Sequence, residues 1–161
     1  MKTAIIYVSY HHNNTEKIAR EMATVLDADL KKVSTFDPSE LSGYDLLGFG
    51  SGIYFGRHHR NLLKLVAKLP ATNRKAFIFS TSGRIFDKVI PEYHKAMRAA
   101  LQKKGFEVID EFNCPGHDTV IFARLASGGK GLNKGRPNEE DLKNAQAFAQ
   151  NLKNRFNDME S

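Results

Sequence analysis

The sequence of 161 residues contains no tryptophan and only one cysteine. Since Cys114 has no second cysteine to pair with, it cannot form a disulfide within the chain, and a reducing, cytoplasmic location is expected. No segment approaches the roughly 18–20 apolar residues of a membrane span, so we expect no membrane insertion. The apolar stretch Ala4–Val8 is also too short for the core of a secretory signal peptide. Without tryptophan, stacking on any planar ligand must use tyrosine, phenylalanine or histidine.

The net charge of +6 is unevenly distributed along the chain. Residues 57–104 contain twelve lysines and arginines against Asp87 and Glu92, whereas the segments on either side each have a slight acidic excess. One interpretation is a set of solvated helix faces. The other is a positive surface that attracts an acidic partner or an anionic substrate. Nucleic acid is not an expected partner, because no basic motif interleaved with aromatic residues accompanies the charge.

Apolar runs typical of buried strands alternate with helical spacing along the whole chain. The expected strands are Ala4–Val8, Leu30–Val33, Leu46–Phe49, Ala76–Phe79 and Phe106–Phe112. This alternation predicts an α/β fold in a single domain over residues 1–161. Its centre would be a doubly wound, five-stranded parallel sheet of order 2-1-3-4-5, with helices on both faces. Residues 113–138 show no clear element, and a loop of that length is typically functional or disordered.

Ligands of such sheets bind at the carboxyl ends of the strands, here between the first and third strands. The loop after the first strand contains Ser9, Asn14 and Thr15, and it leads into a helix. Free amides and the dipole at a helix N-terminus favour an anion, so this loop is a candidate phosphate site. The alternative is an ordinary helix cap made by Asn14 or Thr15.

Two further loops are expected at the same edge of the sheet. After the third strand, Tyr54 and Phe55 lie between Gly52 and Gly56, and such aromatic residues need a cover, either a planar ligand or the protein itself. After the fourth strand comes the small polar turn 80–84. The three loops together predict a ligand with a phosphate at one end and a flat ring at the other, which is a description of flavin mononucleotide (FMN).

These motifs resemble those of a known family. The stretch from Ser9 to Ala19 is similar to the phosphate-binding motif of the flavodoxin family, and residues 50–56 and 81–83 are similar to its two ring-binding loops. The seven-residue first loop and residues 53–59 also resemble flavodoxin-like protoporphyrinogen oxidases. The resemblance implies FMN and electron transfer. The residues that it implies for cofactor binding are Ser9, His11, Asn13, Asn14, Thr15, Ser51, Gly52, Ile53, Tyr54, Phe55, Gly56, Thr81, Ser82 and Gly83.

Three functions remain open from the sequence. The first is an FMN electron carrier that acts with a redox partner protein. The basic middle segment favours an acidic partner. The second is an FMN oxidoreductase that acts on a quinone or a protoporphyrinogen, and the third is a non-redox binding module on the same fold. No catalytic residue and no metal site are expected, although His11-His12 and His58-His59 form adjacent pairs.

The basic character also leads to an expectation about the cofactor's reduction potential. Flavodoxins are typically acidic, which disfavours the negatively charged reduced flavin. Here Arg57, His58 and Arg84 flank the predicted ring loops, so we expect a less negative potential than that of an acidic flavodoxin.

Overall fold

The computed structural model describes residues 1–10, 12–83, 90–119 and 128–161. Its centre is a parallel sheet of order β2-β1-β3-β5-β6. The strands are β1 (Thr3–Val8), β2 (Asp29–Lys32), β3 (Leu46–Tyr54), β5 (Lys75–Ser82) and β6 (Glu107–Pro115). A short strand β4 (Arg57–His58) pairs antiparallel with the end of β3. If β4 is left out and the five parallel strands are renumbered in chain order, the order becomes 2-1-3-4-5. The predicted doubly wound α/β fold is therefore confirmed.

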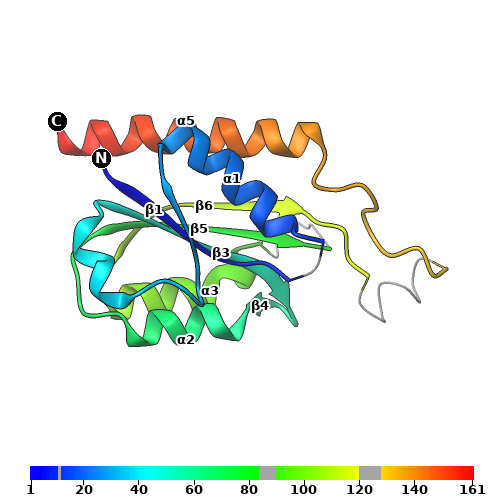
Figure 1. Cartoon of the computed structure of the whole chain (residues 1–161), viewed down its shortest axis with the longest axis horizontal. Helices are drawn as coiled ribbons and strands as arrows, with labels where there is room; N and C mark the ends of the chain where they lie inside the picture. The colour runs from blue at the N-terminus through cyan, green and yellow to red at the C-terminus, as the bar shows by residue number, and fades with distance from the viewer. Residues whose placement is uncertain (11, 84–89, 120–127) are drawn as a thin grey trace.

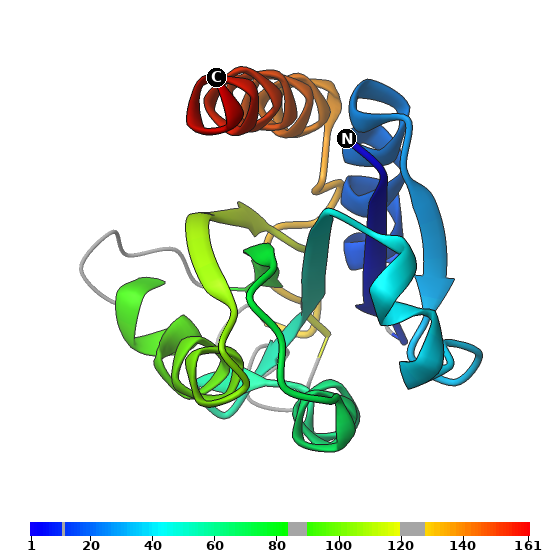
Figure 2. The same ribbon diagram turned by 90° about the vertical axis from the view of Figure 1, so that its left-hand side faces the viewer.

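Helices cover both faces of the sheet (Figures 1 and 2). Helices α1 (Asn14–Leu26) and α5 (Glu139–Glu160) lie side by side on one face. Helices α2 (Arg60–Lys68) and α3 (Ile90–Lys103) lie on the other, and a 3-10 helix, η1 (Pro38–Gly43), precedes β3. Within the described segments, no helix combines the length and the apolar character that crossing a bilayer requires.

The side chains of β1 show why its apolar run is continuous. Ala4, Ile6 and Val8 belong to the core on the α2 and α3 face, whereas Ile5 and Tyr7 belong to the core on the α1 and α5 face. Successive side chains of a strand point to opposite faces, so a strand covered by helices on both sides needs apolar residues at every position. The run from Ala4 to Val8 was predicted as a strand for this reason.

Two glycines in β3 make room for phenylalanine rings of the neighbouring strand. Gly48 is paired with Phe77 and Gly50 with Phe79 in the parallel register of β3 and β5. A Cβ atom on Gly48 would lie 2.3 Å from the ring of Phe77, and one on Gly50 would lie 2.0 Å from that of Phe79. The two rings therefore occupy the space that side chains of β3 would otherwise fill.

The strands are longer than the apolar runs predicted. The third strand was predicted to end at Phe49, but β3 continues to Tyr54, and the fourth continues past Phe79 to Ser82. The added residues are mainly glycine, serine and threonine, which carry little strand signal although they pair in register across the sheet. Strand β4 was not predicted, because a two-residue strand has no periodicity to detect.

The segment after β6 contains more structure than the sequence indicated. Strand β6 reaches Pro115, and Asp118 then forms an isolated bridge with Leu132. Helix α5 begins after Asn138, whose side chain accepts a hydrogen bond from the amide of Asp141, while the Asp141 side chain accepts one from the amide of Asn138. Residues 120–127 of the predicted loop lie outside the described residues.

The glycine–phenylalanine packing can be tested by Gly48→Ala. We expect this substitution to lower the free energy of unfolding by about 1–3 kcal/mol, because the new methyl group overlaps the ring of Phe77. Chemical denaturation measures the change. Gly43→Ala is the control, since the nearest atom to its added Cβ is 4.0 Å away. Equal stability of the two variants would contradict the argument.

Candidate functional site

The loops after β1, β3 and β5 meet at one edge of the sheet. In the parallel register, Ser51 is paired with both Val8 and Ser80, and Gly52 is paired with Thr81. The carboxyl ends of the three strands are therefore level, and a hollow lies between their loops. We call this hollow the cradle. The predicted residues that line it are Ser9, Asn14 and Thr15 from the first loop, Gly52, Ile53 and Tyr54 from β3, and Thr81, Ser82 and Gly83 from β5.

Other predicted residues lie elsewhere. Ser51 is completely buried, and its hydroxyl donates to the carbonyl of Gly52 and accepts from the amide of His59. Phe55 is 96% exposed at the tip of the hairpin formed by β3 and β4, with Gly56 beside it, and neither lines the cradle. Asn13 is exposed immediately before α1. His11 lies outside the described residues.

Several residues that line the cradle were not among the predicted site residues: Tyr10, Gly116, His117 and Asp118. The last three follow β6 directly, so the rule that ligands bind at strand carboxyl ends pointed to them as well. No pattern in the sequence indicated that this part of the long segment lies against the first loop. Asn14 makes that contact, because its side-chain amide donates to the carbonyl of His117 at 2.9 Å.

The N-terminus of α1 receives one side-chain hydrogen bond from outside the helix, because the amide of Glu16 donates to the hydroxyl of Ser9 at 3.3 Å. Asn13 at the cap position makes no side-chain hydrogen bond to the helix, and both it and His12 have positive φ angles, of 53° and 54°. Thr15 instead shares a hydrogen bond with Thr81 at 3.0 Å, and the side-chain oxygen of Asn14 is buried with no partner among the described residues. The alternative of a cap made by Asn14 or Thr15 therefore does not describe this helix, and the first-turn amides other than that of Glu16 are the ones that an anion can bind.

His12 in the loop after β1 contacts His117 in the loop after β6. The rings of His12 and His117 are stacked with their centroids 4.3 Å apart, and His12 also shares a hydrogen bond with the hydroxyl of Thr119. The Nε2 atom of His117 is buried, and none of the residues that the structure describes is its partner. A buried polar atom that lacks a partner is costly, so a ligand with hydrogen-bonding groups would be well placed here.

Tyr54 narrows the other end of the cradle. A Cβ atom on Gly52 would lie 3.1 Å from the Tyr54 ring, and the hollow that remains measures about 60 Å³. Burial raises the pKa of Tyr54, and the nearby charge of Asp118 adds to this effect. Tyr54 precedes a turn in which Phe55 and Gly56 both have positive φ angles, as in the type I′ turns of two-residue hairpins. A phenylalanine with positive φ is strained, and such strain concentrates at functional sites.

Beneath the cradle lies a buried polar cluster, defined here as Ser51, His58, Ser80, His94 and Glu111. The ring of His58 shares a hydrogen bond with Ser51 at 2.9 Å, and that of His94 shares bonds with Ser80 at 2.7 Å and with Glu111 at 3.0 Å. The two rings lie 5.1 Å apart. Because Ser51 and Ser80 lie in β3 and β5, the cluster holds the ends of both strands on the face of the sheet that α2 and α3 cover.

The charges of this cluster follow from burial and pairing. Burial raises the pKa of Glu111, but hydrogen bonds from His94 and Arg98 outweigh it and bring the pKa to about 2. Burial lowers the pKa of His58 to about 3, assisted by His94. His58 is therefore neutral at pH 7. The expectation that it adds positive charge near the ring loops is wrong, and Arg84 lies outside the described residues.

The remaining histidines and Cys114 show no metal chemistry in the described segments. No group of three or more histidine, cysteine, aspartate or glutamate side chains there is arranged to hold a metal ion. The adjacent His58 and His59 have different partners, since His59 accepts a hydrogen bond from the amide of Asn61. Cys114 is buried, which raises the pKa of its thiol and favours the unreactive form.

Comparisons with known proteins agree with this geometry. Residues 4–116 match the family model described as a flavodoxin domain. The chain is 48% identical over 152 residues to an uncharacterized protein of Methanocaldococcus jannaschii, covering 94% of this chain and 98% of that one. An archaeal flavodoxin structure superposes with a TM-score of 0.68 at 14% identity, covering 96% and 98% of the two chains. The structure of oxidised flavodoxin 2 from Bacillus cereus superposes with a TM-score of 0.67 at 19% sequence identity, covering 92% of this chain and 95% of that one.

The buried polar cluster predicts a pH dependence of stability. Because the pKa of Glu111 is lowered from 4.5 to about 2 in the folded protein, its contribution is present above pH 4.5 and is lost as the pH falls towards 2. We expect Glu111→Gln to destabilise the protein by roughly 1–3 kcal/mol at pH 7. The difference from the unsubstituted protein should shrink as the pH falls through this window.

Denaturation curves at a series of pH values measure this effect. Glu107→Gln is the matched control, because Glu107 is exposed on the same strand and makes no ion pair with any residue that the structure describes. A difference between Glu111→Gln and the unsubstituted protein that stays constant from pH 7 to pH 2 would argue against an ionised Glu111 in the cluster.

Proposed function

The chain belongs to the flavodoxin domain family, and from that premise we propose that it binds one FMN in the cradle and carries electrons between proteins. Membership of the family implies a flavin cofactor and a redox partner. The observation that carries the proposal is the first turn of α1, to which the cap residue Asn13 makes no side-chain hydrogen bond and which lines the cradle together with the loops after β3, β5 and β6. FMN, when bound, accepts and returns electrons, while the protein sets its position and potential.

The residues of the cradle fit the two ends of this cofactor. Ser9, Asn13, Asn14 and Thr15 would hold the phosphate, together with His11, because their hydroxyls, amides and helix dipole suit an anion without requiring a lysine or arginine. The side-chain oxygen of Asn14, which has no partner among the described residues, would accept a hydrogen bond from a ribityl hydroxyl of FMN rather than from the phosphate, and Nε2 of His117 would also gain a partner from a ligand there.

The ring would lie between the ends of β3 and β5, with Gly52, Ile53 and Tyr54 on one side and Thr81, Ser82 and Gly83 on the other. A flavin ring needs more than the 60 Å³ between these loops, so the Tyr54 side chain has to turn away from Gly52. Ser51, Phe55 and Gly56 complete the predicted set. Ser51 would act by positioning the end of β3, and Phe55 and Gly56 by forming the hairpin turn.

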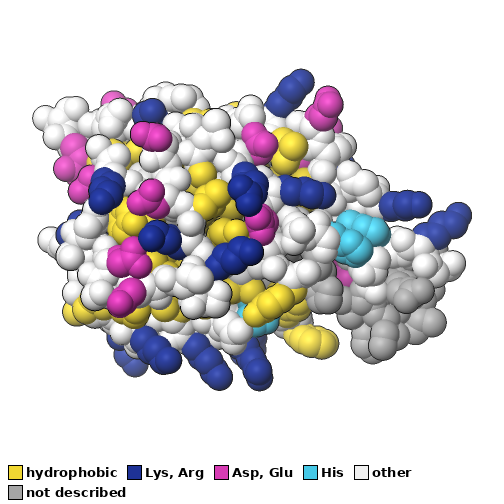
Figure 3. All heavy atoms as spheres, viewed as in Figure 1, with side chains coloured by type: hydrophobic (Ala, Val, Ile, Leu, Met, Phe, Trp, Pro, Cys, Tyr) yellow, Lys and Arg dark blue, Asp and Glu magenta, His cyan; other side chains and the backbone are white. Residues whose placement is uncertain are grey.

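The partner that this surface favours is an acidic protein in the cytoplasm. Figure 3 shows a row of basic side chains along the edge of the molecule where α2 lies. Arg60, Lys64 and Lys68 of α2 and Arg57 of β4 are exposed, and α2 contains no acidic residue. Opposite charges attract over several ångströms and increase the rate of association, so this face would guide an acidic partner to the cradle.

A second candidate function is an FMN oxidoreductase that acts on a quinone or a protoporphyrinogen. The observation that favours it, for the quinone in particular, is a separate groove of about 310 Å³ next to the cradle, which shares Ser9 and Tyr10 with it. Turnover of a quinone or a protoporphyrinogen by the purified protein, with no carrier protein added, distinguishes this candidate from a carrier.

Asn13→Asp tests the phosphate site. The new carboxylate would repel the phosphate, so we expect FMN to bind at least about tenfold more weakly, and riboflavin, which lacks the phosphate, to be affected much less. Quenching of flavin fluorescence measures both affinities. Because an acidic residue at a helix N-terminus is stabilising, thermal stability should not fall.

The same change at the opposite edge of the sheet provides the control for Asn13→Asp. Asn73 is exposed just before β5, so Asn73→Asp should leave FMN affinity unchanged. An absorption spectrum of the protein mixed with FMN gives the broader test. If FMN causes no spectral change at any concentration, the proposal fails.

Asp118→Asn tests the electrostatics of the part of the cradle in which the flavin ring would lie. The carboxylate of Asp118 lies so close to Gly83 that a Cβ atom there would be 2.6 Å from its oxygen. Because a negative charge disfavours the reduced flavin, its removal should make the two-electron potential less negative by roughly 10–40 mV. A potentiometric titration measures the shift, with Asp158→Asn at the exposed end of α5 as the control. A more negative potential would contradict the placement of the ring.

A further inference from the structure

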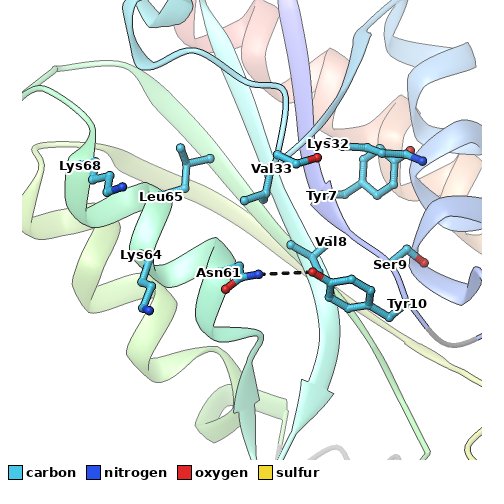
Figure 4. Close-up of a pocket in the computed structure, with 11 residues that line it drawn as sticks. Tyr7, Val8, Ser9, Tyr10, Lys32, Val33, Asn61, Lys64, Leu65 and Lys68 are labelled. Atoms are coloured by element: carbon cyan, nitrogen blue, oxygen red, sulfur yellow. Dashed lines mark hydrogen bonds between the residues drawn. The ribbon is translucent and has the colours of Figure 1, made fainter.

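A second hollow, which we call the α2 groove, lies between α2 and the ends of β1 and β2. It measures about 310 Å³. Figure 4 shows Asn61, Lys64, Leu65 and Lys68 along the α2 side, with Val8, Val33 and Tyr10 opposite them. The four residues of α2 follow the spacing i, i+3, i+4, i+7, so they form one face of the helix.

The lining of the α2 groove is apolar at its centre and positive at one side. Val8, Val33 and Leu65 provide the apolar surface, and no acidic residue is among the lining residues. Lys32 also borders the groove, but its ammonium group lies 3.9 Å from Glu16, on the side of the sheet covered by α1.

Lys64 and Lys68 have no such counter-charge. Both are exposed, and neither forms an ion pair with any part of the chain that the structure describes. They are four residues apart on one helix face, a spacing at which like charges destabilise a helix. An anion placed between them would relieve this repulsion, and neighbouring apolar side chains would cover the rest of the ligand.

The α2 groove is distinct from the cradle, although the two are neighbours. Ser9 and Tyr10 line both, and Tyr10 forms the boundary between them. The Tyr10 hydroxyl accepts a hydrogen bond from the side-chain amide of Asn61 at 3.3 Å, and its ring lies 5.0 Å from that of His59. These contacts hold the Tyr10 side chain against the start of α2.

We propose that the α2 groove binds a small amphipathic anion, an aromatic molecule of one or two rings that bears a carboxylate. The volume of 310 Å³ is at the lower end of the range for small-molecule sites and is a poor match for the four linked rings of a tetrapyrrole. The carboxylate lies by Lys64 and Lys68, and the rings lie against Leu65, Val8 and Val33. This site goes beyond the proposed electron transfer and does not require FMN.

Calorimetric titration with 2-naphthoate tests the proposal, because this probe has two fused rings and one carboxylate. We expect saturable binding at one site, and binding at least about tenfold weaker for the neutral 2-naphthamide. Lys64→Gln/Lys68→Gln should weaken 2-naphthoate binding by a similar factor while leaving 2-naphthamide unaffected. Lys103→Gln/Lys143→Gln removes two exposed charges from α3 and α5 and should bind 2-naphthoate normally.

FMN titrations separate this proposal from the proposed function. The α2 groove should bind 2-naphthoate with or without FMN, and Lys64→Gln/Lys68→Gln should bind FMN with unchanged affinity. If FMN fails to bind while 2-naphthoate binds as described, the proposed function falls and the groove assignment stands.

Three results would overturn the groove assignment. The first is absent or non-saturable binding of 2-naphthoate, and the second is equal affinity in the protein that lacks Lys64 and Lys68. The third is binding of polyglutamate through these two lysines without binding of 2-naphthoate, which would assign the surface to an acidic protein. Nuclear magnetic resonance shifts of the methyl groups of Val8, Val33 and Leu65 on titration give an independent measure of where the probe lies.

Discussion

The hydrogen bond between Thr15 and Thr81 fixes the first turn of α1 against the end of β5. Both side chains are almost completely buried, so breaking this bond would leave two hydroxyl groups without partners in the interior. A helix N-terminus attracts anions only within about one turn, and its position relative to the sheet therefore decides where a phosphate can bind. The loops after β3 and β6 are arranged around this fixed point.

The buried polar cluster gives the ends of β3 and β5 a similar support on the opposite face of the sheet. His58 and His94 connect through Ser51 and Ser80 to the two strands, and Arg98 holds Glu111 at the edge of the cluster. A buried network whose hydrogen bonds are nearly all made specifies one arrangement of its members. The loops of the cradle thus extend from strands that are held by polar contacts on both faces of the sheet, through Thr81 on the α1 face and through Ser51 and Ser80 on the other.

The sequence predicted the fold well because its strongest signal, continuous apolar runs, has a direct physical cause in a sheet buried on both faces. It also identified the residues at the carboxyl ends of β1, β3 and β5, because topology alone determines which strand ends meet. It could not place His117 and Asp118, whose positions depend on contacts with Asn14 and His12 more than a hundred residues earlier. Nor could it show that Ser51 points into the interior or that burial keeps His58 neutral.

The exposed basic residues of α2 are not the residues that pack the helix against the sheet. Leu62, Leu65 and Val66 are buried and hold the helix against the sheet, whereas Arg60, Lys64 and Lys68 are exposed. Without an acidic residue in α2, these charges repel one another at the cost of a few tenths of a kcal/mol per neighbouring pair. A single glutamate among them would have removed that cost. The positive face beside the cradle and the α2 groove therefore carries a small cost in helix stability, and it is the face to which we assign the proposed anionic ligand and acidic partner.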